Sequence, residues 1–170
     1  MSAASPKKYD VFISFRGQDT RETFTSHLHY ALCKENIITY IDDNLVKGDE
    51  IGPALAQAIQ DTRISLIIFS KHYATSKWCL NELLKILECR KFHGQVVMPV
   101  FYNTDTSHVR NQKGSYEEAF AKYDGEAIHN ESLAKSVSEW RKALAEAANI
   151  PGWDSQSRNY KYVTSQRKGI

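Results

Sequence analysis

Cysteine is scarce in this 170-residue sequence, and long apolar runs are absent. Cys33, Cys79 and Cys89 lack CxxC spacing and stand in helix-like apolar patterns, so we expect reduced core thiols, not disulfides. No run approaches the ~18 apolar residues of a membrane helix, and residues 1–8 lack the apolar stretch of a signal peptide. These absences favour a cytoplasmic or nucleocytoplasmic protein with no membrane partner.

A strong charge of one sign is also missing. The chain has 22 basic and 20 acidic side chains, a net charge of +2, which does not call for nucleic acid as a partner. Its 42% apolar and 25% charged residues are close to the globular average, which argues against global disorder. The length suits one domain with its own core.

Several catalytic motifs are absent as well. The sequence contains no GxGxxG, no GxxxxGK[ST] and no GxSxG, so a dinucleotide fingerprint, a Walker loop and a serine nucleophile elbow are excluded. The six histidines are scattered without ligand spacing, and we expect no metal site. Any chemistry must therefore come from residues that the fold gathers.

Apolar runs alternate with amphipathic segments along the chain. Strands are predicted at residues 9–15, 37–41, 64–70, 96–102 and 150–153. Helices are predicted from about 20 to 36, from Pro53, from 76 to about 92, from a cap at Ser115, and from 131 to 148, with 103–114 as a polar loop. This alternation predicts an α/β fold with one parallel sheet and helices on both faces.

In such sheets, ligands bind beyond the carboxyl ends of the strands. Four segments therefore converge on one crevice, namely Arg16 with Gly17, the loop 42–50, the segment 70–78 and the loop after the fourth strand. Trp78 and Glu82 stand four residues apart, so on a helix they share a face and could form a site there. The alternative interpretation is that Trp78 anchors the core and Glu82 is a solvated charge.

The crevice would suit a nucleotide. Arginine side chains such as Arg16 and Arg21, with Lys47, would hold a pyrophosphate, and Trp78 would stack on a base. The Glu82 carboxylate would stabilise an oxocarbenium-like transition state, and because cationic nicotinamide is a good leaving group, one carboxylate could suffice. Alternatively, Arg16 only pairs with Asp42 or Asp43, and Lys47 is solvated.

Four motifs in order resemble the plant TIR domain, the amino-terminal signalling module of TIR-type nucleotide-binding leucine-rich-repeat immune receptors. They are residues 9–21, 42–50, 76–83, and 98–102 with Asp105, Val109 and Arg110. The resemblance divides the chain into a disordered arm at 1–8, a TIR domain at 9–153 and a disordered or atypical tail at 154–170.

The resemblance implies a single-domain, flavodoxin-like, doubly wound sheet with strand order 2-1-3-4-5. It also implies self-association and hydrolysis of NAD⁺ or NADP⁺ to nicotinamide and ADP-ribose-type signalling nucleotides, with no tightly bound cofactor. These products would trigger defence and cell death through lipase-like immune proteins. Other TIR domains and TIR-type receptors would be its partners. Some members also act on nucleic acid, a weaker expectation here.

The family motifs also imply roles for individual residues. Glu82 would be the catalytic glutamate, and residues 42–51 would form the gating BB loop. Ser26 and His27 would lie on a helix–helix self-association surface, although from the residues alone we expect ordinary polar side chains at the protein surface. The residues expected to bind substrate are Phe15, Arg16, Gly17, Lys47, Ser76 and Trp78.

Two departures from the family pattern lead to an alternative. Val46 stands where many relatives have a second basic residue, so a weaker grip on substrate is expected. Residues 155–170 carry no apolar stripe for the family's last helix, so we expect the self-association surface of the first helix to lack its partner helix. The sequence shows no nucleotide-binding or leucine-rich portion, and we expect a TIR-only protein or an excerpt. The alternative function is a non-catalytic TIR adaptor or decoy. A phospho-receiver is disfavoured, because Phe15-Arg16 and Ser70-Lys71, not clustered acids, end the first and third strands.

Overall fold

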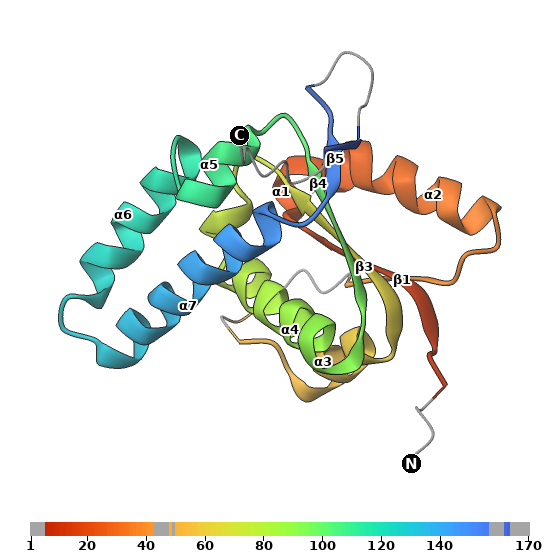
Figure 1. Ribbon diagram of the computed structural model, residues 1–170, viewed down its shortest axis with the longest axis horizontal. Helices are drawn as coiled ribbons and strands as arrows, with labels where there is room; N and C mark the ends of the chain where they lie inside the picture. Colours follow the sequence, from red (N-terminus) through yellow and green to blue (C-terminus); the bar gives the residue numbers. More distant parts are fainter. Residues whose placement is uncertain (1–5, 43–47, 49, 157–161, 164–170) are drawn as a thin grey trace, which may run out of the picture.

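A five-stranded parallel sheet forms the centre of the computed structural model, which describes residues 6–42, 48 and 50–156 and the backbone of 162 and 163 (Figure 1). The sheet order is β2-β1-β3-β4-β5, which confirms the expected 2-1-3-4-5 topology. The strands are β1 (Tyr9–Phe15), β2 (Thr39–Ile41), β3 (Thr62–Phe69), β4 (Val96–Phe101) and β5 (Gly152–Asp154).

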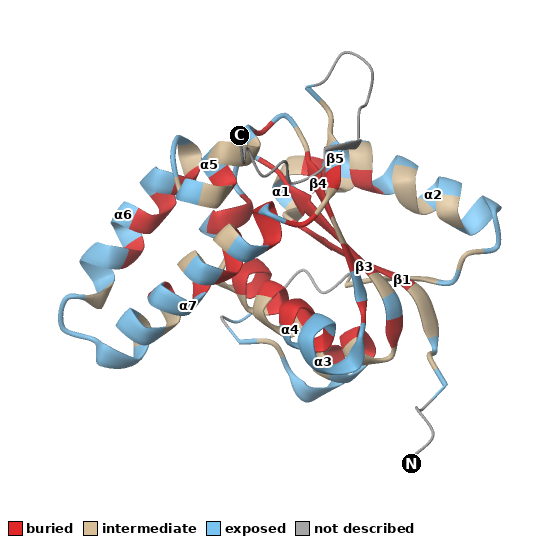
Figure 2. Cartoon of the chain, viewed as in Figure 1, coloured by how far each residue is buried: buried red, intermediate tan, exposed pale blue. Residues whose placement is uncertain are grey.

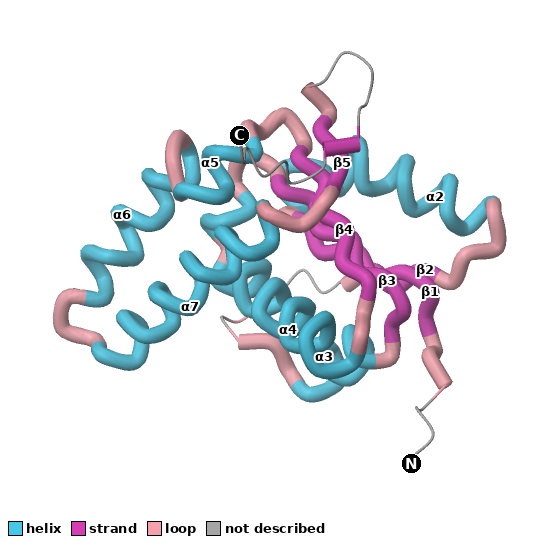
Figure 3. Tube along the Cα trace, viewed as in Figure 1, coloured by secondary structure: helices cyan, strands magenta, loops and turns pink. Residues whose placement is uncertain are grey.

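Helices lie on both faces of this sheet (Figure 3). One face is covered by α3 (Pro53–Gln60), α4 (Lys77–His93) and α7 (Glu131–Ala148), with α5 (Thr106–Asn111) and α6 (Ser115–Ala127) packed on α7. The other face is covered by η1 (Arg21–Thr25) and α2 (Ser26–Lys34), which follow the four-residue α1 (Gly17–Thr20). A short 3₁₀ turn, η2 (Tyr73–Thr75), joins β3 to α4.

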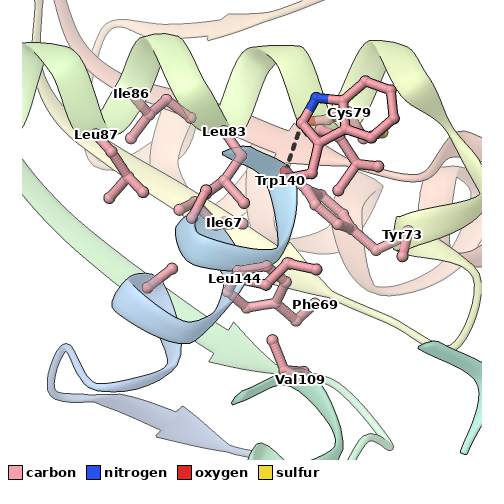
Figure 4. Close-up of a cluster of buried hydrophobic side chains, with 14 of the residues drawn as sticks. Ile67, Phe69, Tyr73, Cys79, Leu83, Ile86, Leu87, Val109, Trp140 and Leu144 are labelled. Carbon is pink, nitrogen blue, oxygen red and sulfur yellow. Dashed lines mark hydrogen bonds between the residues drawn. The ribbon is translucent and has the colours of Figure 1, made fainter. Parts of the chain in front are cut away.

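The two faces differ in how deeply they are buried. On the α4 face, Leu83, Ile86 and Leu87 of α4 pack with side chains of β3 and α7 in one large cluster (Figure 4). On the other face, no residue of α2 is fully buried, and its apolar residues only partly cover the sheet (Figure 2). Because a helix gains its stability mainly from tertiary burial, α2 is the less firmly held side of the fold.

Four details differ from the sequence-based expectations. The first helix is not continuous, because Thr23 has non-helical backbone angles (φ −124°, ψ −108°) in a threonine-rich segment that competes poorly for helix. The expected loop 103–114 contains α5, capped by Asp105, whose Oδ1 accepts from Ser107 N at 2.8 Å.

Ser115 is the first helical residue of α6 and not its cap, a position taken by Gly114. Cys33 is exposed, since α2 lies at the surface, whereas the other two cysteines are buried.

A sixth strand was not predicted. β6 (Tyr162–Val163) lies in the expected tail and pairs antiparallel with β5, with Trp153 opposite Tyr162. The edge of the parallel sheet next to β5 is therefore paired at these two positions. No helix in the described part of the chain is both long and apolar enough to span a membrane.

Candidate functional site

The start of α4 is fixed by its own sequence. Ser76 has an extended backbone and caps the helix, its Oγ accepting from Cys79 N at 3.1 Å, and Gly94 ends the helix in the left-handed conformation (φ 65°). This places Trp78 in the first turn and Glu82 one turn further on. Both are buried, with 9% and 2% of their surface exposed. Glu82 is therefore not a solvated charge, and that interpretation was wrong.

A cavity of about 990 Å³ opens beside Trp78, between the carboxyl end of β1 and the starts of α1 and α4, with α6 as its far wall. Four of the predicted substrate-binding residues line it, namely Arg16, Gly17, Ser76 and Trp78. The loop 42–50 contributes Gly48, whereas Lys47 lies outside the described residues. The prediction that the segments after β1 and β3 meet at one crevice is thus confirmed by this geometry. The loop after β4 was also expected there, but none of its residues lines the cavity.

Glu82 is not among the residues that line this cavity, although it lies one turn along α4 from Trp78, which does. Its Oε1 accepts a hydrogen bond from Ser14 Oγ at 3.2 Å, which ties the carboxylate to β1 two residues before Arg16. A carboxylate in an apolar core is costly unless it is hydrogen-bonded or paired. The contact with Ser14 supplies part of that compensation.

Phe15 does not line the cavity, contrary to the expectation. Side chains alternate along a strand, so Phe15 points to the α2 face of the sheet, opposite to Ser14 and Glu82, and is only 3% exposed. Its ring supports Arg21, whose guanidinium carbon lies 5.0 Å from the ring centroid, and Arg21 itself lines the cavity. Phe15 therefore supports the cavity wall through Arg21.

Arg16 has donor capacity to spare. Its Nη2 donates to Gln18 Oε1 at 3.2 Å, while its buried Nε has no hydrogen-bond partner among the described residues. No ion pair joins Arg16 to Asp42 in that part of the chain, so the alternative pairing is not seen there. An unsatisfied guanidinium N–H is suited to an anionic oxygen such as that of a phosphate.

Asp19 is a cavity residue that sequence reasoning missed. Its Oδ2 accepts from Ser70 Oγ at 2.6 Å and from His72 N at 2.7 Å, and its Oδ1 lies 2.8 Å from His72 Nδ1. Burial acts to raise the pKa of the Asp19 carboxyl, but the hydrogen bonds from Ser70 and His72 outweigh it, so this pKa lies below the ordinary aspartate value. Asp19 thereby ties the start of α1 to the segment after β3.

Sequence reasoning also missed the part of the cavity wall that α6 supplies. Lys122, Tyr123 and Glu126 line the cavity, and Lys77 Nζ of α4 lies 3.5 Å from Glu126 Oε2, which bridges the two helices. The α6 residues lie some 40 positions beyond the α4 motif, and only tertiary packing brings them together. A lysine or a glutamate in a helix such as α6 gives no local sign in the sequence that it lines a cavity.

The predicted self-association residues lie away from the cavity. Ser26 and His27 are exposed at the start of α2, where Ser26 Oγ donates to Thr23 O at 3.1 Å. Within the described residues, no cluster of three or more His, Cys, Asp or Glu side chains could hold a metal ion. The cavity is therefore the best candidate for a binding or catalytic site, because arginine and lysine side chains lie on opposite walls.

The sequence and the structure are similar to known plant proteins. A family model described as TIR domain matches residues 8–165. The sequence is 50% identical over 153 residues to disease resistance protein RPV1 of Vitis rotundifolia, covering 90% of this chain and 10% of that protein. It is 47% identical over 152 residues to TMV resistance protein N of Nicotiana glutinosa, covering 89% and 13%. The chain thus spans a small fraction of the length of these relatives.

The fold is similar to that of a solved immune assembly. One chain of the activated Roq1 resistosome directly recognizing the pathogen effector XopQ (TIR domains) matches with a TM-score of 0.80 and 43% sequence identity, covering 89% of this chain and 90% of that one.

Proposed function

This chain belongs to the TIR domain family, and from that premise we propose that it hydrolyses NAD⁺ or NADP⁺ in plant immune signalling when several copies assemble. The products would be nicotinamide and ADP-ribose-type nucleotides that reach lipase-like immune proteins and trigger defence and cell death. The likeness to a chain of an activated resistosome supports the part of the proposal that concerns assembly.

One observation carries the enzymatic part of the proposal. Glu82 is a buried carboxylate, 2% exposed, one helical turn from Trp78, which lines a nucleotide-sized cavity together with Arg16. Desolvating an ionised carboxylate costs several kcal/mol even after relaxation, so an apolar residue would serve a purely structural role better. A carboxylate kept at this cost, next to a ring and a guanidinium, suits an active site.

The chemistry is the cleavage of a glycosidic bond. The bond between the ribose C1′ and the nicotinamide nitrogen breaks, its electron pair neutralises the pyridinium, and an oxocarbenium ion develops on the ribose. The Glu82 carboxylate stabilises that positive charge, and water then adds to C1′ and releases a proton. Arg16 and Arg21 would hold the pyrophosphate, and the Trp78 indole would stack on a base.

Substrate bound in the cavity must reach the Glu82 carboxylate. Because Glu82 does not line the cavity but Trp78 does, we expect a shift of the Trp78 side chain to open the path. Contact with neighbouring copies would favour the open arrangement. This step explains why low activity is expected in dilute solution.

The test is nicotinamide release from NAD⁺ and from NADP⁺, followed by chromatography over a range of protein concentrations. We expect release per mole of protein to rise with concentration, and to fall about 100-fold in Glu82→Gln, which keeps the shape of the side chain. Glu88→Gln is the matched control, because Glu88 is an exposed carboxylate on the same helix. Equal release by wild type and Glu82→Gln would refute the enzymatic proposal.

The exposure of α2 favours a second candidate function, that of a non-catalytic adaptor or decoy that acts through TIR–TIR contacts. No residue of α2 is fully buried, and Tyr30 is 71% exposed, beside Ser26 and His27 at the surface. Suppression of a TIR-type receptor's cell-death response that persists in Glu82→Gln would support the adaptor. Suppression that is lost in Glu82→Gln would contradict it.

A further inference from the structure

Two buried hydroxyl groups form a hydrogen-bonded cluster with the Glu82 carboxylate. Ser14 Oγ lies 2.9 Å from Tyr73 OH and 3.2 Å from Glu82 Oε1, and Tyr73 OH lies 3.0 Å from the carbonyl oxygen of Cys79. Ser14 and Tyr73 have no exposed surface, and Glu82 is 2% exposed. In Figure 4, Tyr73 and Cys79 lie together at the edge of the apolar cluster.

The cluster joins three segments that are distant in the sequence. Ser14 interrupts the apolar run of β1 and faces α4, Tyr73 belongs to η2, and Glu82 belongs to α4. An apolar side chain at position 14 would pack in the core without any need for partners. Buried polar groups of this kind are costly when only partly satisfied. Their grouping around one carboxylate therefore indicates a role tied to that carboxylate.

The number of hydroxyl protons limits how the cluster can bond. Ser14 and Tyr73 each have one proton, but they take part in three contacts. When Glu82 is ionised, Ser14 donates to Glu82, and the single proton of Tyr73 can go to Ser14 or to the Cys79 carbonyl. When Glu82 is protonated and donates to Ser14, Ser14 can donate to Tyr73, and Tyr73 then donates to the Cys79 carbonyl. The direction of the Ser14 hydroxyl is thus tied to the protonation state of Glu82, and Tyr73 can donate to Ser14 when Glu82 is ionised.

We propose that Ser14 and Tyr73 are positioning residues for Glu82, which hold its carboxylate in one orientation and favour its ionised form. This inference rests on the proposed function, because the ionised form is the one that stabilises an oxocarbenium ion. The two bonds of the ionised arrangement run in series, and each polarises the next. Ser14 supplies the direct bond, and Tyr73 orients Ser14.

The raised pKa of Tyr73 is consistent with this arrangement. Burial, followed by the charges of Cys79 and Glu82, raises the pKa of Tyr73 well above its ordinary value, so its hydroxyl remains a donor at neutral pH. Tyr116 of α6 couples to the same group in the same direction. Cys79 and Glu82 of α4 and Tyr116 of α6 are thus titratable side chains whose charges act on Tyr73.

The variants Ser14→Ala and Tyr73→Phe test the proposal in the full chain, with Tyr116→Phe as the matched control. Tyr116 is equally buried, but its hydroxyl donates to the Ser70 carbonyl at 2.8 Å and has no bond to the cluster. We expect Ser14→Ala and Tyr73→Phe to lower kcat for nicotinamide release about tenfold to 100-fold, with KM nearly unchanged, because the carboxylate is misplaced. The acid limb of their pH–rate profiles moves to higher pH, since the ionised form loses a donor. We expect Tyr116→Phe to change neither kcat nor the acid limb of the pH–rate profile.

A readout independent of activity separates this inference from the proposed function. The carboxyl carbon of Glu82, assigned in ¹³C-glutamate-labelled protein by its loss in Glu82→Gln, reports the protonation of Glu82 directly. We expect the titration midpoint to rise in Ser14→Ala, and by less in Tyr73→Phe. A raised midpoint in a protein that releases no nicotinamide supports the cluster while refuting hydrolysis.

The overturning result is equally specific. If wild type releases nicotinamide, but neither kcat nor the Glu82 midpoint differs in Tyr73→Phe and Ser14→Ala, the two hydroxyl groups do not position Glu82. Should Ser14→Ala fail to fold, Tyr73→Phe decides by the same two measurements, since it keeps the ring in place.

Discussion

At the scale of single residues, the cavity depends on contacts made by side chains that do not touch the reacting atoms. Arg21 lies over Phe15, and a Cβ added at Gly17 would come within 3.1 Å of the Arg21 Nε and Nη2 atoms. Gly17 thus keeps space for the guanidinium at the cavity wall. The absence of a side chain is the feature that matters at position 17.

Gly17→Ala is therefore expected to weaken substrate binding by displacing Arg21. The added methyl group meets the flexible end of Arg21 and no backbone, so KM should rise several-fold while the melting temperature changes little. A double-mutant cycle with Arg21→Ala checks the cause, because the effect of Gly17→Ala should vanish in the Arg21→Ala background. Additive effects of the two substitutions on KM would contradict this explanation.

Asp19 leads to a prediction about pH. Because the folded-state pKa of Asp19 is depressed, its stabilising contribution is complete above the ordinary aspartate pKa of about 4 and is lost as the pH falls through the lower folded value. Asp19→Asn should thus lower the free energy of unfolding by about 1 to 2 kcal/mol near neutral pH. The difference in the free energy of unfolding between wild type and Asp19→Asn should disappear at low pH.

Urea unfolding of wild type and Asp19→Asn at about pH 7 and about pH 3 measures that gap. Comparison of the two proteins at each pH cancels the other carboxylates, which they share. A stability difference that is the same at both pH values would show that the charge of Asp19 contributes nothing.

The sequence could identify part of this site and not the rest. Strand ends and helical spacing were enough to bring Arg16, Ser76 and Trp78 to one cavity, because both are local patterns. The same reasoning misplaced Phe15, since neighbouring strand residues face opposite sides of a sheet and the sequence does not say which side holds the site. It could not find Lys122, which tertiary packing alone brings to the cavity.

At the scale of elements, β5 and β4 approach each other closely at Gly152. A Cβ at Gly152 would lie 2.2 Å from the carbonyl oxygen of Pro99, a distance that no relaxation of a side chain can relieve. Gly152 therefore permits β5 to pair with β4 and complete the parallel sheet. The pairing places Trp153 beside Val100.

Gly152→Ala is expected to destabilise the fold by about 2 kcal/mol or more, because backbone must move to admit the methyl group. Gly125→Ala is the matched control, since a Cβ at this position in α6 meets nothing within 4 Å and alanine favours helix. The control should be neutral or stabilising in thermal unfolding. Equal melting temperatures for wild type and Gly152→Ala would contradict the close approach.

Elements with strong local signals were predicted well, and those set by tertiary contacts were not. The α7 helix spans 131–148 as expected, and Gly94 ends α4 where its left-handed backbone requires. The break at Thr23 and the short α5 lacked a periodic pattern. The pairing of β6 with β5 depends on a partner strand and not on its own two residues.

At the scale of the whole molecule, the two faces of the sheet are covered unequally. The α4 face carries several layers of helix, whereas the α2 face carries one partly exposed helix (Figure 2). If assembly uses that exposed helix, His27→Glu should leave the melting temperature unchanged and weaken self-association. Sedimentation velocity over a range of concentrations measures the association. Equal association of His27→Glu and wild type would place assembly elsewhere.

The most direct test of the account compares wild type with Glu82→Gln under conditions in which sedimentation shows the same assembled state for both. The measured quantity is the initial rate of nicotinamide release from NAD⁺ per assembled chain. The account predicts a rate about 100-fold lower in Glu82→Gln, with Glu88→Gln equal to wild type. Equal rates in wild type and Glu82→Gln would contradict the claim that the buried carboxylate below Trp78 does the chemistry.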